Sequence, residues 1–294
     1  MPQFQTRDGA TLHYYDVGKG PLCIMLHGFG MSSELWLPLV APLLRKHRFV
    51  LLSQRGFGRS HSQSFDQDCI MAQLADDLGD LLNHLDVKQC HLAGYSMGAC
   101  ASMQYLTKYT DPRIKGYLHV DQAACISNKD DWKWGVFGPE HERWMTDLDD
   151  LLSAIAPVPA DAAFADLPKA LRQQVCTAFS DFFEVAAHKR WLRWGSRAVK
   201  VQALATTMLP THNWRVYLHC MKAYATQQYD YRDALAPVNV PIWNFVGDQS
   251  RMYDATGQLK LQEMVAGPVT NVHFQECGHA LPFEAPRRFT RKLG

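Results

Sequence analysis

Short apolar runs alternate with amphipathic stretches along the first 120 residues of the chain. Alternating or continuous apolar residues predict strands at 11–16, 22–26, 49–52, 90–93 and 114–120. Apolar residues that recur every three or four positions predict helices at 35–46, 69–85 and from 97 to about 109. Strands that alternate with helices in this way typically form a parallel sheet with helices on both faces, which binds ligands at the carboxyl ends of its strands.

The pattern changes between residues 127 and 236. This stretch reads as helices with few strand candidates, and it carries six of the eight tryptophans of the chain. Strand character returns at 241–246 and 271–274, followed by a last helix at 284–293. The sequence therefore predicts an α/β fold with a doubly wound, mostly parallel sheet; we expect an eight-stranded sheet, of which these patterns mark seven strands. Residues 1–126 and 237–294 would form the core, and residues 127–236 an inserted helical cap.

A serine between two glycines lies at the end of the strand predicted at 90–93. The segment reads Gly94-Tyr95-Ser96-Met97-Gly98 and leads into the next helix. A Gly-x-Ser-x-Gly sequence between strand and helix is typical of a sharp turn that exposes the serine hydroxyl above the sheet, and the turn leaves no room for side chains at the two glycines. The alternative, an ordinary loop serine, does not explain this context. The pattern predicts Ser96 as a nucleophile.

A serine hydroxyl needs a base within hydrogen-bond reach, normally a histidine that a carboxylate holds in place. His279 is the best candidate because it lies in a loop between the last predicted strand and the last predicted helix. Acyl transfer also needs hydrogen-bond donors for the oxyanion, usually the backbone N–H after the nucleophile and one from an early strand-end loop. These would be the amides of Met97 and Phe29. A structural His279 and a plain glycine turn around Phe29 are the alternatives.

Several motifs, taken in order, resemble those of the α/β-hydrolase superfamily. They are His27-Gly28-Phe29-Gly30, Arg55-Gly56-Phe57-Gly58-Arg59-Ser60, Gly94-Tyr95-Ser96-Met97-Gly98, Val240-Pro241 before a strand, and Gly278-His279. The chain looks most similar to the small cofactor-free esterases and the haloperoxidase-like perhydrolases of that superfamily. The resemblance covers the chain outside the predicted cap. It implies a Ser–His–acid triad and the cleavage of an ester, thioester, lactone or amide.

The chain departs from the family pattern at the acid. The family usually has an aspartate three residues after a glycine at the end of the seventh strand, where this chain has Ser250 after Gly247. Asp121, at the end of the strand predicted at 114–120, is the favoured acid, because a carboxylate at a buried strand end needs a partner. Asp248 is the main alternative, and Asp254 a further one. Asp248 could equally be a solvated or capping carboxylate.

Composition and charge narrow the classes of partner. The formal net charge is +1, with acids and bases mixed along the chain, so neither nucleic acid nor a membrane is expected as a partner. We find no signal-peptide pattern and no membrane-length apolar run, so we expect a cytoplasmic protein. The eight cysteines are scattered and are expected to be reduced, and no His-Glu-x-x-His pattern suggests a metal. Neither metal nor cofactor is expected, and the sequence predicts no oligomeric state.

These features predict a serine hydrolase that cleaves a small or medium apolar ester, thioester or lactone through an acyl-enzyme on Ser96. Two alternatives remain. One is a carbon–carbon bond hydrolase or perhydrolase with the same triad. The other is a non-catalytic ligand-binding member of the fold, which the serine at position 250 makes conceivable.

Overall fold

The computed structural model describes residues 1–65, 69–159, 162–197, 213–227 and 229–294, without the side chains of 194–197 and 225. Within these residues, eight strands form one sheet in the order β1-β2-β4-β3-β5-β6-β7-β8. Their bounds are β1 Gln3–Gln5, β2 Thr11–Gly18, β3 Leu22–Leu26, β4 Arg48–Ser53, β5 Cys90–Tyr95, β6 Ile114–Val120, β7 Ile242–Gly247 and β8 Val269–Phe274. The strands β3 to β8 run parallel, while β2 pairs antiparallel with β1 and β4. The predicted fold class, a mostly parallel eight-stranded sheet, is confirmed.

The register of the central strands sets the position of the residues that follow them. The last residues of β5 and β6, Tyr95 and Val120, are directly paired, and Val120 also pairs with Phe245 of β7. Parallel strands aligned in this way release their next residues at the same edge of the sheet. Segments far apart in the sequence therefore meet beyond the ends of β5, β6 and β7.

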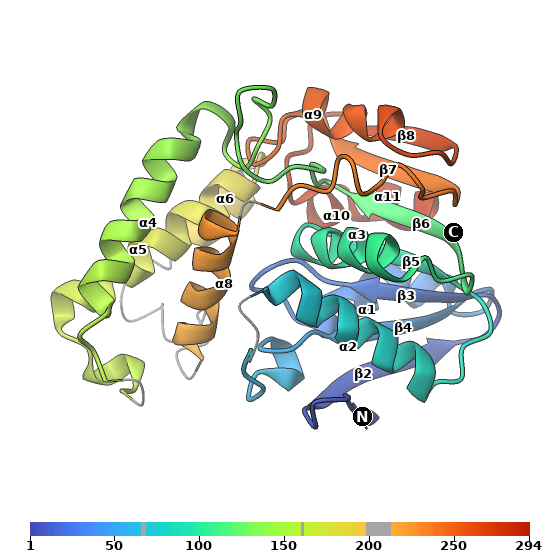
Figure 1. Cartoon of the computed structure of the whole chain (residues 1–294), viewed down its shortest axis with the longest axis horizontal. Coiled ribbons are helices and arrows are strands. Elements are labelled where there is room, and N and C mark those ends of the chain that lie inside the picture. Colours follow the sequence, from blue (N-terminus) through green and yellow to red (C-terminus); the bar gives the residue numbers. More distant parts are fainter. Residues whose placement is uncertain (66–68, 160–161, 198–212, 228) are drawn as a thin grey trace.

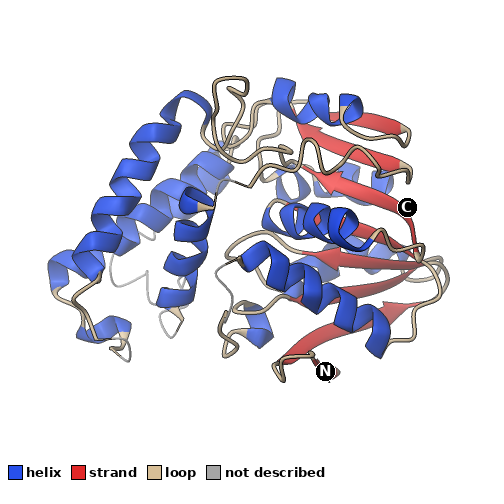
Figure 2. Cartoon of the chain, in the orientation of Figure 1, coloured by secondary structure: helices blue, strands red, loops and turns tan. Residues whose placement is uncertain are grey.

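Helices cover both faces of the sheet (Figures 1 and 2). On one face lie α2 (Ile70–His84) and α3 (Met97–Tyr109). The buried residues of α2 recur at helical spacing, for example Leu74, Leu78 and Leu81, and they join the larger of two apolar cores. The opposite face is covered by α1 (Leu37–Val40), α10 (Leu281–Glu284) and α11 (Pro286–Leu293). A short helix α9 (Ala255–Leu259) follows β7.

One predicted helix is broken in the structure. The stretch 35–46 forms a 3₁₀ turn at Ser33–Trp36, the single α-helical turn α1 and a second 3₁₀ turn at Ala41–Leu43. Pro38 and Pro42 each lie near the start of a new turn, because proline lacks the N–H that a continuous helix needs and fits only in a first turn. The apolar spacing was present, but the prolines divide the segment.

The residues between β6 and β7 form a separate group of helices beyond the carboxyl ends of the strands (Figure 1). These are α4 (His141–Ile155), α5 (Lys169–Ala186), α6 (Arg190–Arg197) and α8 (Trp214–Thr226). The two ends of the insertion lie together, since Ile126 N–H donates to Tyr229 O at 2.9 Å and Tyr231 N–H to Ala124 O at 2.9 Å. The limits 127 and 236 stay a prediction, and residues 160–161, 198–212 and 228 lie outside the described part. No helix in the described ranges is long and apolar enough to cross a membrane.

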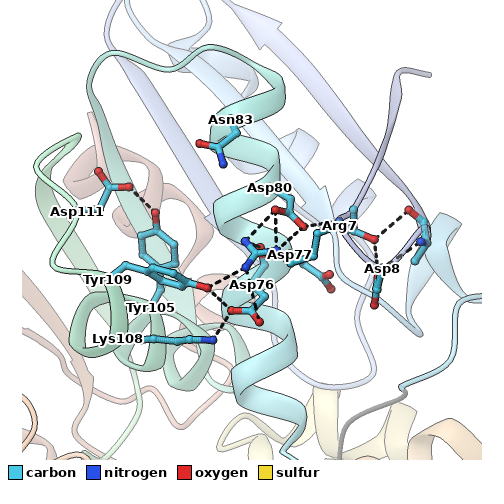
Figure 3. Close-up of polar contacts among 12 residues, drawn as sticks. Arg7, Asp8, Asp76, Asp77, Asp80, Asn83, Tyr105, Lys108, Tyr109 and Asp111 are labelled. Carbon is cyan, nitrogen blue, oxygen red and sulfur yellow. Dashed lines mark hydrogen bonds and ion pairs between the residues drawn. The ribbon is translucent and has the colours of Figure 1, made fainter.

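Acidic residues of α2 form ion pairs with the turn between β1 and β2 and with the end of α3 (Figure 3). Asp80 pairs with Arg7 at 2.8 Å and Asp76 with Lys108 at 2.6 Å, and both pairs are partly exposed. Between them in the sequence, Asp77 contacts the Arg55 guanidinium at 2.7 Å, and both side chains are only 2% exposed. Burial raises the pKa of Asp77 to about 6, although Arg55 favours its charged form. Removing one partner of the buried pair should therefore cost more folding free energy than removing one partner of an exposed pair.

We expect Asp77→Asn to destabilise the fold by about 3 kcal/mol at pH 8, because it leaves the buried Arg55 guanidinium with only the partly exposed Asp8 as a charged partner. Asp80→Asn is the matched control on the same helix and should cost less than about 1 kcal/mol, since Arg7 is half exposed. Urea unfolding followed by circular dichroism measures both. Equal losses in the two variants would contradict the expectation.

Candidate active site

Ser96 occupies a strained turn between β5 and α3. Its backbone has φ 53° and ψ −120°, a conformation that costs free energy in any residue with a side chain. The turn is held by Ser96 N–H, which donates to Val120 O at 3.1 Å, and by Ala99 N–H, which donates to Ser96 O at 2.7 Å. This conformation places Ser96 at the carboxyl ends of the central strands.

The two flanking glycines are required by the packing of this turn. A Cβ at Gly94 would lie 2.5 Å from Gly98 O, and a Cβ at Gly98 would lie 2.4 Å from Leu26 O. Both distances are far below van der Waals contact with backbone atoms that cannot move away. The steric explanation that the sequence offered for the glycine spacing agrees with these distances.

His279 reaches Ser96 from the loop between β8 and α10. Its Nε2 lies 2.8 Å from Ser96 Oγ, and its Nδ1 lies 2.6 Å from Oδ2 of Asp121. All three side chains are buried. An ionised carboxylate can only accept, so the imidazole proton lies on Nδ1 and Nε2 accepts from the Ser96 hydroxyl.

Asp121 follows β6 directly and is fully buried. Besides His279, its carboxylate accepts hydrogen bonds from the Gly247 N–H (2.8 Å), the Ser250 hydroxyl (2.8 Å) and the Gln258 amide (3.1 Å). A buried charge is tolerated only when it is paired and hydrogen-bonded, and four donors meet that need. They also fix the rotation of the carboxylate that faces the imidazole.

The other two acids that the sequence offered are engaged elsewhere. Asp248 Oδ1 contacts His273 Nδ1 at 2.8 Å in a partly exposed pair. Asp254 caps α9, accepting from Thr256 N–H at 2.7 Å. The structure thus brings Asp121, rather than Asp248 or Asp254, to His279.

The predicted oxyanion donors are the backbone amides of Phe29 and Met97. Met97 is the first residue of α3, so its N–H has no partner within the helix and lies at the positive end of the helix dipole. Phe29 belongs to the loop after β3. In the described ranges neither amide donates to a backbone carbonyl. Their role as donors to an oxyanion at Ser96 stays a prediction.

The loop that carries Phe29 is anchored by His27. Gln54 N–H donates to His27 Nε2 at 3.1 Å, the imidazole Nδ1–H donates to Gly28 O at 2.9 Å, and the Gln54 amide donates to His27 O at 2.6 Å. Burial lowers the pKa of His27 to about 4. A neutral imidazole with both nitrogens occupied has a structural role and leaves His279 as the histidine at Ser96.

A small apolar pocket of about 30 Å³ adjoins Ser96. Apart from the serine, its walls are aliphatic, aromatic or methionine side chains, among them Met145, Leu148, Phe182 and Met221. A wider cavity of about 900 Å³ lies against α4 and α5 and shares Leu148 and Met221 with the pocket. The Ser96 hydroxyl therefore faces an almost entirely apolar pocket, and charged side chains line only the wider cavity.

The tryptophans between residues 127 and 236 mostly pack within the protein rather than line the pocket beside Ser96. Trp144 lines both cavities, but Trp132 and Trp134 pack against each other with ring centres 5.1 Å apart. Trp191 is 62% exposed, and the side chain of Trp194 lies outside the described residues. Phenylalanines and methionines supply more of the wall than tryptophans do.

The sequence reasoning missed the residues that support Asp121. In the sequence, Ser250 stands out only as a departure from the family pattern, and nothing singles out Gln258. The signal available for Ser250 was its place three residues after Gly247, at the end of the strand beside β6. Among the described side chains, no three His, Cys, Asp or Glu gather closely enough to hold a metal ion.

Comparisons with known proteins agree with this architecture. The chain is 29% identical over 115 residues to a pimeloyl-acyl-carrier-protein methyl ester esterase of Aeromonas hydrophila, covering 39% of this chain and 43% of that protein. It is 25% identical over 187 residues to 3-oxoadipate enol-lactonase 1 of Acinetobacter baylyi, covering 59% of this chain and 69% of the lactonase. The match therefore spans less than half the length of the first of these relatives.

The fold of an esterase from Exiguobacterium antarcticum superposes on 99% of this chain and 97% of its own, with a TM-score of 0.76 and 19% identity. Residues 21–286 match the family model described as alpha/beta hydrolase fold. That match covers most of the chain, including the segments around Ser96, Asp121 and His279. The chain belongs to the alpha/beta hydrolase fold family.

Proposed function

We propose that this protein is a serine hydrolase that cleaves a small or medium apolar ester, thioester or lactone through an acyl-enzyme on Ser96. The observation that carries the proposal is the pair of hydrogen bonds through His279, 2.8 Å to Ser96 Oγ and 2.6 Å to Asp121 Oδ2. A hydroxyl, an imidazole and a buried carboxylate in this order form the unit that activates a serine at neutral pH.

In the first half of the reaction, Ser96 Oγ attacks the carbonyl carbon while His279 Nε2 takes the hydroxyl proton. Negative charge develops on the carbonyl oxygen, and the Phe29 and Met97 amides donate to it. Asp121 keeps the Nδ1 proton of His279 in place and stabilises the imidazolium. The intermediate then collapses, the bond to the leaving group breaks, and His279 returns the proton to the leaving oxygen or sulfur.

In the second half, water takes the place of the leaving group. His279 Nε2 accepts a proton from the water as it attacks the acyl carbon, and the same two amides hold the oxyanion. The ester bond to Ser96 then breaks, and its oxygen recovers the proton from His279. The product is a carboxylic acid, and the serine is restored without any cofactor.

The apolar pocket beside Ser96 favours a substrate with a small acyl group. Its volume is only about 30 Å³, so a short acyl chain fills it before side chains must move. The flexible Met145 and Met221 in its wall allow a limited extension. The names of the two relatives, a methyl ester esterase and an enol-lactonase, also support an ester or a lactone as the substrate.

Substitution of the three proposed catalytic residues tests the mechanism. Ser96→Ala should abolish turnover of p-nitrophenyl acetate. Asp121→Asn should lower kcat by about 10⁴-fold, because the amide no longer holds the reactive tautomer of His279. Asp248→Asn is the matched control and should retain wild-type kcat, since Asp248 contacts His273 at the surface.

Two further outcomes separate this mechanism from the alternatives. A fluorophosphonate serine probe should label wild-type protein at Ser96 and leave Ser96→Ala unlabelled. Absence of both labelling and turnover would favour a ligand-binding member of the fold. Wild-type activity in Asp121→Asn, with loss in Asp248→Asn, would contradict the assignment of the acid. Product analysis with hydrogen peroxide or with carbon–carbon substrates separates a perhydrolase or carbon–carbon hydrolase from an esterase.

The size of the acyl pocket gives a second prediction. We expect kcat/KM for p-nitrophenyl acetate to exceed that for p-nitrophenyl octanoate by about tenfold or more, because a longer chain must displace the pocket wall. Met221→Ala should reduce or reverse this ratio, since Met221 lines both the pocket and the wider cavity and a shorter side chain there enlarges the pocket. Met264→Ala, at the end of a 3₁₀ turn of the core, is the control and should keep the wild-type ratio. A preference for octanoate in the wild type would contradict the pocket assignment.

A further inference from the structure

Besides Asp121, a second buried carboxylate contacts the His279 loop. Glu284, the last residue of α10, is 4% exposed. Its Oε2 accepts from the N–H of Gly278, the residue before His279, at 2.5 Å. Its Oε1 accepts from the N–H groups of His188 and Lys189, between α5 and α6, at 2.7 and 2.6 Å. One side chain therefore joins the histidine loop to the helices inserted between β6 and β7.

Other contacts reinforce this junction. The Ala280 N–H donates to Ala186 O at 2.9 Å, and Lys189 Nζ donates to Glu284 O at 2.7 Å. A Cβ on Gly278 would lie 2.9 Å from the His188 nitrogen, so the two backbones are in direct contact. Ala280, after His279, is thus bonded to the last residue of α5, and Gly278, before it, is joined through Glu284 to the segment that follows α5.

The same end of α5 also contacts the loop that carries Phe29. The Phe29 and Phe182 rings lie 5.1 Å apart, and a Cβ on Gly30 would lie 2.8 Å from Phe183 Cζ. The C-terminal end of α5 therefore packs against the proposed oxyanion loop and, through Glu284, against the histidine loop. A shift of this end would move both relative to Ser96.

We propose that Glu284 is a positioning residue that ties His279 to the inserted helices and so sets its distance from Ser96. The proposal rests on the proposed function for its kinetic consequence. Glu284 does not touch Ser96 or the pocket beside it. A carboxylate can form this bridge because it has two acceptor oxygens. One accepts from the histidine loop, and the other accepts from the segment after α5.

Glu284→Gln tests this bridge with almost no change in shape. Glutamine has one acceptor oxygen, and its NH₂ group would face an N–H donor, so one side of the bridge is lost. We expect kcat to fall by about 10- to 100-fold with little change in KM, because a small misplacement of a catalytic group is costly. The rate is expressed per active site titrated with the fluorophosphonate, which removes any loss of folded protein. Glu263→Gln, at the surface, is the matched control and should keep wild-type kcat.

A second readout follows His279 without turnover. The proton in the Nδ1–Asp121 hydrogen bond gives a far-downfield ¹H NMR resonance, and we expect it to shift or broaden in Glu284→Gln but not in Glu263→Gln. A merely stabilising Glu284 would lower the melting temperature and leave this resonance unchanged in the folded protein. If the wild type proves inert towards esters and the serine probe, the proposed function fails, and the resonance still tests the bridge.

Lys189→Pro tests the side of the bridge away from His279. Proline removes the Lys189 N–H from Glu284 Oε1, and because Lys189 lies directly before α6, no hydrogen bond within the helix is lost. Lys189→Ala is its control, because both variants lose the Nζ contact and only proline loses the N–H. We expect kcat per titrated site to be several-fold lower in Lys189→Pro than in Lys189→Ala. Equal rates in these two variants, or wild-type kcat and resonance in Glu284→Gln, would overturn the proposal.

Discussion

The 2.6 Å hydrogen bond between His279 and the buried Asp121 is the interaction on which the site depends. It fixes which imidazole nitrogen carries the proton and therefore which one faces Ser96. Asp121 has no solvent to stabilise its charge, so it holds its position only because four donors from three other segments converge on it. The same convergence joins β6, the end of β7, α9 and the histidine loop into one rigid unit.

The geometry of the sheet explains how Asp121, which follows β6, can reach His279 in place of an acid that follows β7. β6 and β7 are neighbouring parallel strands, so the residues after Val120 and after Gly247 meet at one edge. Ser250 lies after β7 and donates to the oxygen of Asp121 that also contacts His279. The residue found where the family usually has its acid thus supports an acid from the adjacent strand. A carboxylate at both positions would place two like charges beside one imidazole, which is unfavourable.

Periodicity and motif order were enough to predict most of the fold and the meeting of Ser96 with His279. Both residues follow strands whose apolar runs are easily recognised. The three-residue strand β1 was too short to leave a pattern, and prolines divided the helix expected at 35–46. Gln258 and Glu284 could not be assigned roles from the sequence. The contacts that define those roles, from Gln258 to Asp121 and from Glu284 to His188 and Lys189, join residues more than 90 positions apart and depend on tertiary packing.

Two buried carboxylates on either side of the histidine loop give it little freedom. Asp121 holds the imidazole ring, whereas Glu284 holds the backbone just before it and attaches that backbone to the segment after α5. Hydrogen bonds to a charged acceptor are stronger than neutral ones, and water cannot compete for them at buried sites. A histidine on a loop can therefore be as well positioned as one on a strand, provided that buried carboxylates fix both the ring and the chain. The inserted helices then belong to the support of the site as well as to the wall of its pocket.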